Sequence, residues 1–225
     1  MQKLLTKASI VATAVMALTA AGAANAAPAA SHAGQAQAVK GSSAALSVLY
    51  DQTANDSGIA IVSQNFETGN DPFDSQAADD FVVPAGASWA VGEVDVLGQY
   101  FNGFGLATSE HVTFYKDKNG KPGKVIADFP GLVGTDNGTG SFAITLPTPV
   151  KLKAGTYWVA VQIDMDFTVG GEWGWENQTT VEGAPAKWAN PGDGFLTGCT
   201  KYQTETICIP DGQGDHAFRL KGKAK

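Results

Sequence analysis

The sequence predicts an all-β protein, folded as one antiparallel, jelly-roll-like β-sandwich domain, and three observations lead to this fold class. From Leu46 onward, short segments alternate apolar and polar residues with a period of two. Clusters of Gly, Pro, Asn and Asp separate these segments at the spacing typical of sandwich strands. No segment of this region requires a helical period. We therefore expect a single β-sandwich domain over residues 46–225.

The clearest predicted strand runs over residues 157–167. One face would present Tyr157, Val159, Val161, Ile163, Met165 and Phe167, and the other Trp158, Ala160, Gln162, Asp164 and Asp166. The first set is expected in the core. Shorter alternating segments, at residues 91–100, 111–115 and 142–146, predict further strands. Asn119-Gly120 and Pro122-Gly123 predict a hairpin turn between residues 115 and 125.

The N-terminus has the features of an export signal. Lys3 and Lys7 flank the start of an apolar run from Ala8 to Ala21, and Ala24-Asn25-Ala26 follows as a small-residue cleavage site. We interpret residues 1–26 as a signal peptide and the Ala/Ser/Gln-rich residues 27–45 as a disordered linker. No other stretch approaches about twenty uninterrupted apolar residues, so no membrane anchor is expected. The predicted location is secreted or periplasmic.

The charge of the exported chain is acidic. Without Lys3 and Lys7, 13 basic residues face 22 acidic ones, which changes the net charge from −7 to −9. Arg219 is the single arginine. This balance disfavours nucleic acid as a partner and is more often a solubility feature than a functional one, with cation binding as the less common alternative.

The two cysteines, Cys199 and Cys208, are expected to form one disulfide, because exported thiols tend to oxidise. Closing so short a loop would stabilise the fold by about 2.5 to 3 kcal/mol on the chain-entropy model. A metal site or a reactive thiol pair would need further Cys or His nearby in sequence, and none follows closely. We therefore expect a structural role for this pair.

Three local patterns resemble a recurrent, largely uncharacterised β-sandwich domain of secreted and surface proteins of Gram-negative bacteria. The similarity covers roughly residues 50–220. The patterns are Ala78-Asp79-Asp80-Phe81, then Thr113-Phe114-Tyr115 with Asp117, Gly120, Pro122 and Gly123, and then Ala154-Gly155-Thr156-Tyr157-Trp158. The resemblance implies a jelly-roll-like architecture and an extracellular setting. It supplies no catalytic residues.

Asp79 and Asp80 open the segment that leads into Phe81, and strand alternation turns one of the two carboxylates inward. A buried carboxylate needs a partner, which is either a calcium ion or a set of backbone N–H groups. We favour backbone N–H groups, because no EF-hand-like series of oxygen ligands accompanies the pair. Calcium at Asp79 and Asp80 is therefore the less favoured alternative, and no other cofactor is predicted.

Asp164 and Asp166 share their predicted strand face with Trp158. If this face is exposed, the carboxylates would bind sugar hydroxyls while the indole stacks on a sugar ring. Alternatively, a second layer buries the strand on both sides and the aspartates lie at its end. We favour the second arrangement.

The densest aromatic segment is Glu172-Trp173-Gly174-Trp175-Glu176, and Trp188 follows in a turn-rich region. Strand spacing places Trp173 and Trp175 on one face, either as a ligand platform or as part of the core, and core packing is the commoner fate of large aromatic residues. Glu172 and Glu176 lie about 13 Å apart along a strand, which is too far for the two carboxylates of a glycosidase.

No sequence signature of a hydrolase is present, since there is neither a Gly-x-Ser-x-Gly elbow nor a His-Glu-x-x-His segment. We expect a non-enzymatic protein. The first hypothesis is a module that binds a carbohydrate or another cell-envelope polymer. The second is an extracellular structural or protein-interaction protein, which burial of all the tryptophans would favour. The third is a hydrolase with an unrecognised site. The sequence does not indicate an oligomeric state. The ligand residues expected under the first hypothesis are Trp158, Trp173, Trp175, Trp188, Asp164 and Asp166.

Overall fold

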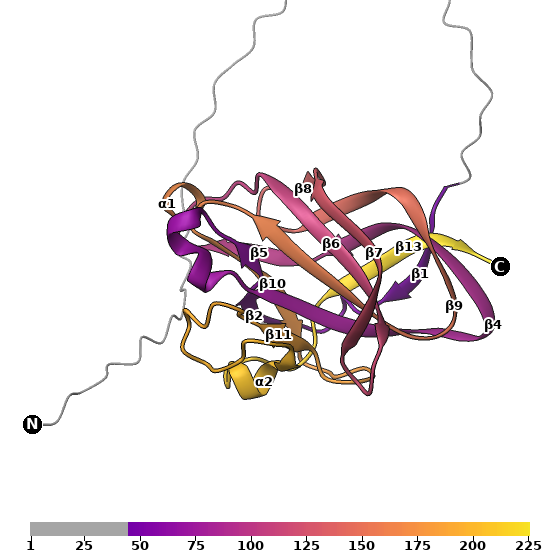
Figure 1. Ribbon diagram of the computed structural model, residues 1–225. Coiled ribbons are helices and arrows are strands. Elements are labelled where there is room, and N and C mark those ends of the chain that lie inside the picture. The colour runs from indigo at the N-terminus through magenta and orange to yellow at the C-terminus, as the bar shows by residue number, and fades with distance from the viewer. Residues whose placement is uncertain (1–44) are drawn as a thin grey trace, which may run out of the picture. The chain divides into compact units, whose positions relative to one another are not determined.

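Two antiparallel sheets packed face to face account for most of the chain in a computed structural model that describes residues 45–225 (Figure 1). The proposed signal peptide, and the linker up to Ala44, lie outside the described residues. The larger sheet has the strand order β1-β13-β4-β9-β6-β7. These strands are β1 (Ser47–Asp51), β13 (Phe218–Ala224), β4 (Gln76–Val96), β9 (Phe142–Asp164), β6 (Ser109–Asp117) and β7 (Pro122–Leu132).

Four short strands extend the larger sheet: β3 (Gln64–Asn65), β8 (Thr135–Asp136), β11 (Lys187–Ala189) and β12 (Gln203–Thr204). The pairing of β3 with β9 is parallel. The smaller sheet has the order β2-β10-β5, formed by β2 (Asp56–Val62), β10 (Glu172–Gln178) and β5 (Gly98–Phe101). The all-β antiparallel sandwich predicted from the sequence is confirmed.

Within residues 45–225, three short helices interrupt the strands, whereas the alternating pattern predicts no helix. They are the 3₁₀-helix η1 (Thr68–Phe73), α1 (Phe167–Gly170) and α2 (Glu205–Cys208). Each has six residues or fewer and connects strands. Among residues 45–225, no helix is long and apolar enough to cross a membrane.

The predicted hairpin is confirmed, because Asp117 at the end of β6 pairs with Pro122 at the start of β7. The left-handed conformation of Asn119 and Gly120, at φ of 56° and 72°, makes the reversal. The predicted core face of β9 is confirmed from Tyr157 to Met165. Phe167 is a correction to that set. The strand ends at Asp164, and Phe167 begins α1 with an exposed fraction of 41%.

The opposite face of β9 is also buried. Trp158 and Ala160 form a small second cluster with Ala78, on which Tyr115 and Tyr202 pack. Tyr115 lies on the neighbouring strand β6, whereas Tyr202 comes from the long excursion between β10 and β13. The arrangement in which a second layer buries the strand on both sides is therefore correct at this position.

The predicted disulfide between Cys199 and Cys208 is present, with a Cα–Cα distance of 5.9 Å. Both cysteines are buried and belong to the main core cluster. The bond closes the segment that leads into α2, so it fixes a local excursion against the sandwich rather than joining the two sheets.

Candidate functional site

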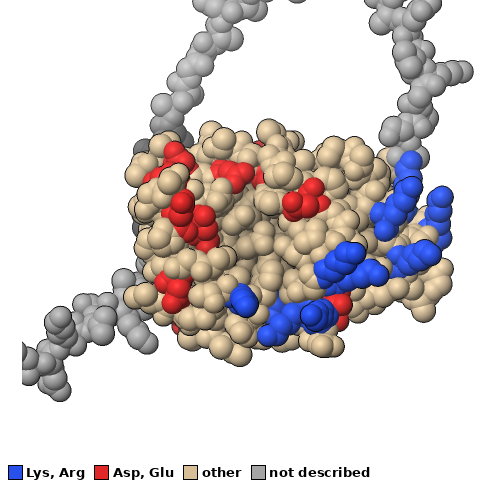
Figure 2. Space-filling model, viewed as in Figure 1, with Lys and Arg blue, Asp and Glu red and all other residues tan. Residues whose placement is uncertain are grey.

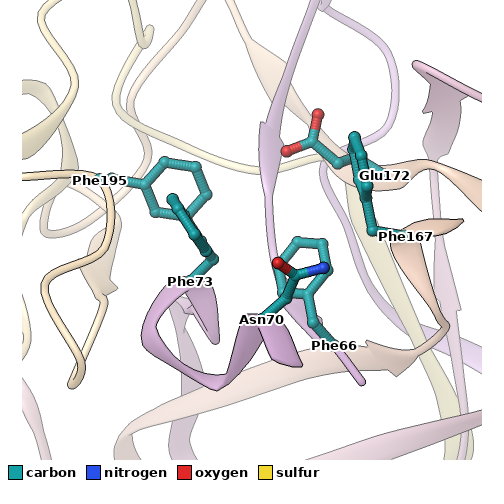
Figure 3. A pocket seen from close by; sticks show the side chains of 6 residues that line it. All are labelled: Phe66, Asn70, Phe73, Phe167, Glu172 and Phe195. Atoms are coloured by element: carbon teal, nitrogen blue, oxygen red, sulfur yellow. The ribbon is translucent and has the colours of Figure 1, made fainter. Parts of the chain in front are cut away.

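A pocket of ≈ 240 Å³ lies at the end of the sandwich where η1 and α1 are found (Figures 1 and 3). Its lining residues come from four separate segments, and most of them are aromatic. They are Phe66, Asn70, Phe73, Phe167, Glu172 and Phe195. In Figure 3, Phe73 and Phe195 form one wall, Phe167 lies on the other side, and the Glu172 carboxylate lies between the walls.

Hydrogen bonds donated to the Glu67 carboxylate hold the wall formed by α1. Its Oε2 accepts from the backbone N–H of Phe167 at 2.7 Å, and its Oε1 accepts from the Asn70 side chain at 2.9 Å. Glu67 therefore joins η1 to α1 across the pocket. Because α1 begins directly after β9 ends, these bonds also fix the direction in which the Phe167 ring leaves the sheet.

Asn190 holds the opposite wall. Its buried side-chain amide donates to the backbone oxygens of Pro72 and Asp74 at 2.7 and 2.8 Å, and its Oδ1 accepts from the N–H of Phe195 at 3.1 Å. The Phe73 and Phe195 rings then meet edge to face, with centroids 5.2 Å apart. Both walls of the pocket are thus braced before any ligand arrives, which lowers the entropic cost of binding.

Glu172, at the start of β10, is the acidic group of the pocket. Its Oε2 accepts a hydrogen bond from the side chain of Asn102, and burial raises the pKa of the carboxyl. Within the described residues, no hydrogen bond to its Oε1 is found, so this oxygen is available to a ligand donor. A half-buried carboxylate between aromatic rings favours hydroxyl or ammonium groups.

Further carboxylates surround the pocket and make this end of the domain acidic (Figure 2). Burial raises the pKa of Asp74, and the nearby charges of Asp71 and Asp164 raise it further. Asp166 is exposed directly before α1. A ligand that carries negative charge would be repelled here, whereas a neutral or cationic one would not.

The tryptophans predicted as ligand residues lie in the interior. Trp173 and Trp175 are 0% exposed, and their indole N–H groups donate to the backbone oxygens of Gly140 at 2.7 Å and Ala217 at 2.9 Å. Trp158 and Trp188 are also 0% exposed, and they donate to Asp117 Oδ1 and to the backbone oxygen of Val62. A ligand does not reach a fully enclosed ring, so core packing replaces the surface-platform interpretation of Trp158, Trp173, Trp175 and Trp188.

The glycines around these tryptophans serve the packing of the chain itself. A Cβ atom added to Gly98 would lie 2.5 Å from the Trp173 ring, and one added to Gly103 would lie 2.3 Å from the backbone oxygen of Gly170. The small residues therefore allow strands and loops to approach closely. They do not open space for a ligand.

Asp164 and Asp166 do not form a binding row with Trp158. The Asp164 carboxylate accepts from the side chains of Asn65 at 2.9 Å and Ser109 at 2.5 Å, which closes the end of β9 against β3 and β6. Asp166 lies beyond the end of the strand. Because Trp158 is buried, the assignment of these two aspartates as ligand residues beside an exposed indole is corrected.

Asp79 and Asp80 are both buried, whereas alternation alone predicted one inward carboxylate. Oδ2 of Asp79 accepts from the Gln52 side chain and from the N–H of His216, both at 2.7 Å, and its Oδ1 accepts from the N–H of Asp80. Asp80 Oδ1 accepts from the N–H of Ala184 at 2.9 Å. These bonds correspond to the backbone N–H alternative. In residues 45–225, no three His, Cys, Asp or Glu side chains are grouped as a metal ion would require.

A buried polar network next to Asp79 was not predicted from the sequence. The His216 ring stacks on Trp175 with centroids 4.5 Å apart, and its Nε2 lies 2.8 Å from Oε2 of Glu205. The two atoms are at ion-pair distance without hydrogen-bond alignment. Asn177 donates to the other Glu205 oxygen at 2.9 Å. His216 and Glu205 are fully enclosed, so this network stabilises the fold and does not face a substrate.

Comparison of the chain with protein-family models, with curated proteins and with solved structures gives no match in any of the three. Of the resemblance noted from the sequence, the structure supports the antiparallel β-sandwich architecture.

Proposed function

We propose that this protein is an exported, non-catalytic binding module that recognises a carbohydrate or another cell-envelope polymer through the aromatic pocket. The observation that supports this proposal is the combination of braced phenylalanine rings with one carboxylate and one amide. Aromatic faces stack on the apolar face of a sugar, and carboxylate and amide groups bind its hydroxyls. The tryptophans have no part in this proposal.

The size and charge of the pocket narrow the ligand. At ≈ 240 Å³ it is smaller than the roughly 300–1,000 Å³ of sites for drug-sized molecules, which suits one sugar ring or the end of a chain. The acidic surroundings favour a neutral or amino sugar over an acidic one. The absence of a second carboxylate among the six lining residues argues against glycoside hydrolysis, which usually requires two.

The test is a glycan array followed by calorimetric titration of the sugars that bind. Phe73→Ala and Phe167→Ala should each weaken binding by tenfold or more, because their rings are 38% and 41% exposed and line the pocket. Phe104→Ala is the matched control, since Phe104 is 97% exposed and does not line the pocket. Failure of every neutral or amino sugar to bind would contradict the proposal.

A second candidate function, protein interaction, is favoured by the burial of all five tryptophans and by the apolar side chains exposed at the same end as the pocket. Gly105 donates a backbone hydrogen bond to Gly170 at 3.0 Å, which places the 102–107 loop against α1. The exposed residues there and next to Phe195 are Phe104 (97%), Leu106 (70%), Val169 (77%) and Leu196 (86%). Contiguous exposed apolar surface is typical of a protein-binding site. Under this alternative, Phe104→Ala is the damaging variant and Phe73→Ala is not.

A further inference from the structure

Positive charge is concentrated at the end of the sandwich opposite the pocket, although the chain as a whole is acidic. In Figure 2, lysines lie along the end of the sandwich where Figure 1 places the C-terminus and the bend of β4. Acidic groups lie at the other end, where η1 and α1 are found. Exposed lysines at the C-terminal end come from β9 and from β13. Such separation of charge is not required for solubility, which an interspersed surface achieves.

Strand register arranges four of these lysines as a grid. Lys151 and Lys223 both pair with Ala90 of β4, one from each side, and Lys153 pairs with Ser88. Lys225 also pairs with Ser88, through backbone hydrogen bonds of 3.0 and 2.9 Å. Directly paired residues share a sheet face, so all four lysines project from one face.

The dimensions of the grid follow from sheet geometry. Two lysines that flank β4 are about 10 Å apart at their Cα atoms, and two lysines on one strand are about 7 Å apart. The opposite face of the sheet carries Trp89 and Leu152 at this position, which are 6% and 3% exposed. Their packing in the core fixes the strands that carry the lysines. Ala90 and Ser88 between the lysines leave the face flat.

Within the described part of the chain, the four lysines lack protein counter-charges. In residues 45–225, none of them has an ion pair, and all four are exposed. The neighbouring Lys221, by contrast, binds Glu93 at 2.8 Å and Asp95 at 2.6 Å. Like charges at these spacings repel one another and oppose folding slightly. An anionic partner laid across the face would remove that repulsion.

From this grid we propose that the protein has a second binding surface, formed by Lys151, Lys153, Lys223 and Lys225, which holds an extended anionic polysaccharide. A flat grid of ammonium groups suits carboxylate or sulfate groups that repeat along a flexible chain. Only Ser88 and Ala90 lie between the four lysines, so the grid itself offers no aromatic ring on which a nucleobase would stack. Val48 of the neighbouring strand β1, which pairs with Lys221, is 55% exposed, and lipid vesicles are therefore included in the test below. The pocket and this surface lie at opposite ends, so this proposal stands independently of the proposed function.

The experiment measures binding of the purified protein to immobilised polygalacturonate by biolayer interferometry at several salt concentrations. Four contacts between lysine ammonium groups and the carboxylates of a flexible polyanion should make the affinity fall on the order of 50-fold between 50 and 200 mM salt. Replacing all four grid lysines by glutamine should weaken binding at least tenfold with an unchanged or higher melting temperature. Replacing all four by arginine should retain it.

The matched control replaces Lys116, Lys118, Lys121 and Lys124 of the hairpin by glutamine, which changes the net charge equally at other positions. This control should retain most of the binding. Equal loss in both glutamine variants would overturn the grid as the site. No binding to polygalacturonate, or binding only to anionic lipid vesicles or to DNA, would overturn the polysaccharide as the partner.

Discussion

The Nε2 atom of His216 lies 2.8 Å from Oε2 of Glu205, and both side chains have no exposed surface. This contact joins α2 to the residues just before β13, while the His216 ring stacks on Trp175 of β10. One residue pair thus connects the disulfide-closed excursion with both sheets.

Glu205→Gln is expected to destabilise the protein by about 2–5 kcal/mol, because removing one member of a buried polar pair leaves the other without compensation. Urea unfolding measures the change. Glu182→Gln, at an exposed position, should leave the midpoint unchanged. Equal midpoints for wild type and Glu205→Gln would show that the pair contributes nothing.

Trp173→Ala and Trp175→Ala are each expected to cost about 3–5 kcal/mol of stability, as is typical for removing a large buried aromatic residue. Each also leaves a backbone acceptor, Gly140 or Ala217, without its indole donor. Acrylamide quenching of the wild-type protein should be weak for the same reason. Strong quenching, or alanine variants with unchanged melting temperatures, would disprove the buried placement.

Stability should fall as pH rises from 5 to 8. Burial raises the pKa of Glu176 to about 7, with a further contribution from the charge of Asp56. Burial also raises the pKa of Asp215 to about 7 and the pKa of Asp80 to about 6. A carboxyl that holds its proton more tightly when folded stabilises the protein below its unfolded pKa, and this contribution is lost as pH rises through the folded pKa.

The size of this pH effect is on the order of 1 kcal/mol per group after solvent screening. Thermal unfolding at pH 5, 6, 7 and 8 measures it. Glu176→Gln should flatten part of the decline, because glutamine stays neutral throughout. A melting temperature that increases from pH 5 to pH 8 would be the opposite of the expected result.

Replacing both cysteines by alanine is expected to destabilise the protein by about 2.5 kcal/mol, as chain entropy predicts for so short a loop. The secondary structure should be retained, because the bond fixes only the excursion around α2. Circular dichroism and urea unfolding measure both quantities. Loss of the β-sheet spectrum would mean that the bond holds the whole sandwich.

The fold was predictable where local patterns decide it. The alternation from Tyr157 to Met165 identified the core face of β9, and Asn119-Gly120 identified the hairpin turn. The burial of Trp158 was only an alternative, because Tyr202, which covers it, lies more than forty residues away in sequence and leaves no periodic signal. Short helices such as α1 have too few residues to show a helical period.

The pocket was missed because its six residues come from four loop or strand-end segments that only the fold brings together. A weak signal was present. Phe73 and Phe195 are large aromatic residues inside turn-rich sequences, Gly69-Asn70-Asp71-Pro72 and Pro191-Gly192-Asp193-Gly194, where little else is apolar. The tryptophans are the stronger aromatic signal in the sequence, but large aromatic residues within strands most often fill the core.

A ¹H–¹⁵N NMR titration of the protein with the sugars that bind on a glycan array locates the ligand directly. We expect the amide signals of the pocket residues to shift and the five indole N–H signals to stay in place; these amides are those of Asn70, Phe73, Phe167, Glu172 and Phe195. Shifts of the Trp173 and Trp175 indole signals, with the pocket amides unmoved, would contradict this expectation.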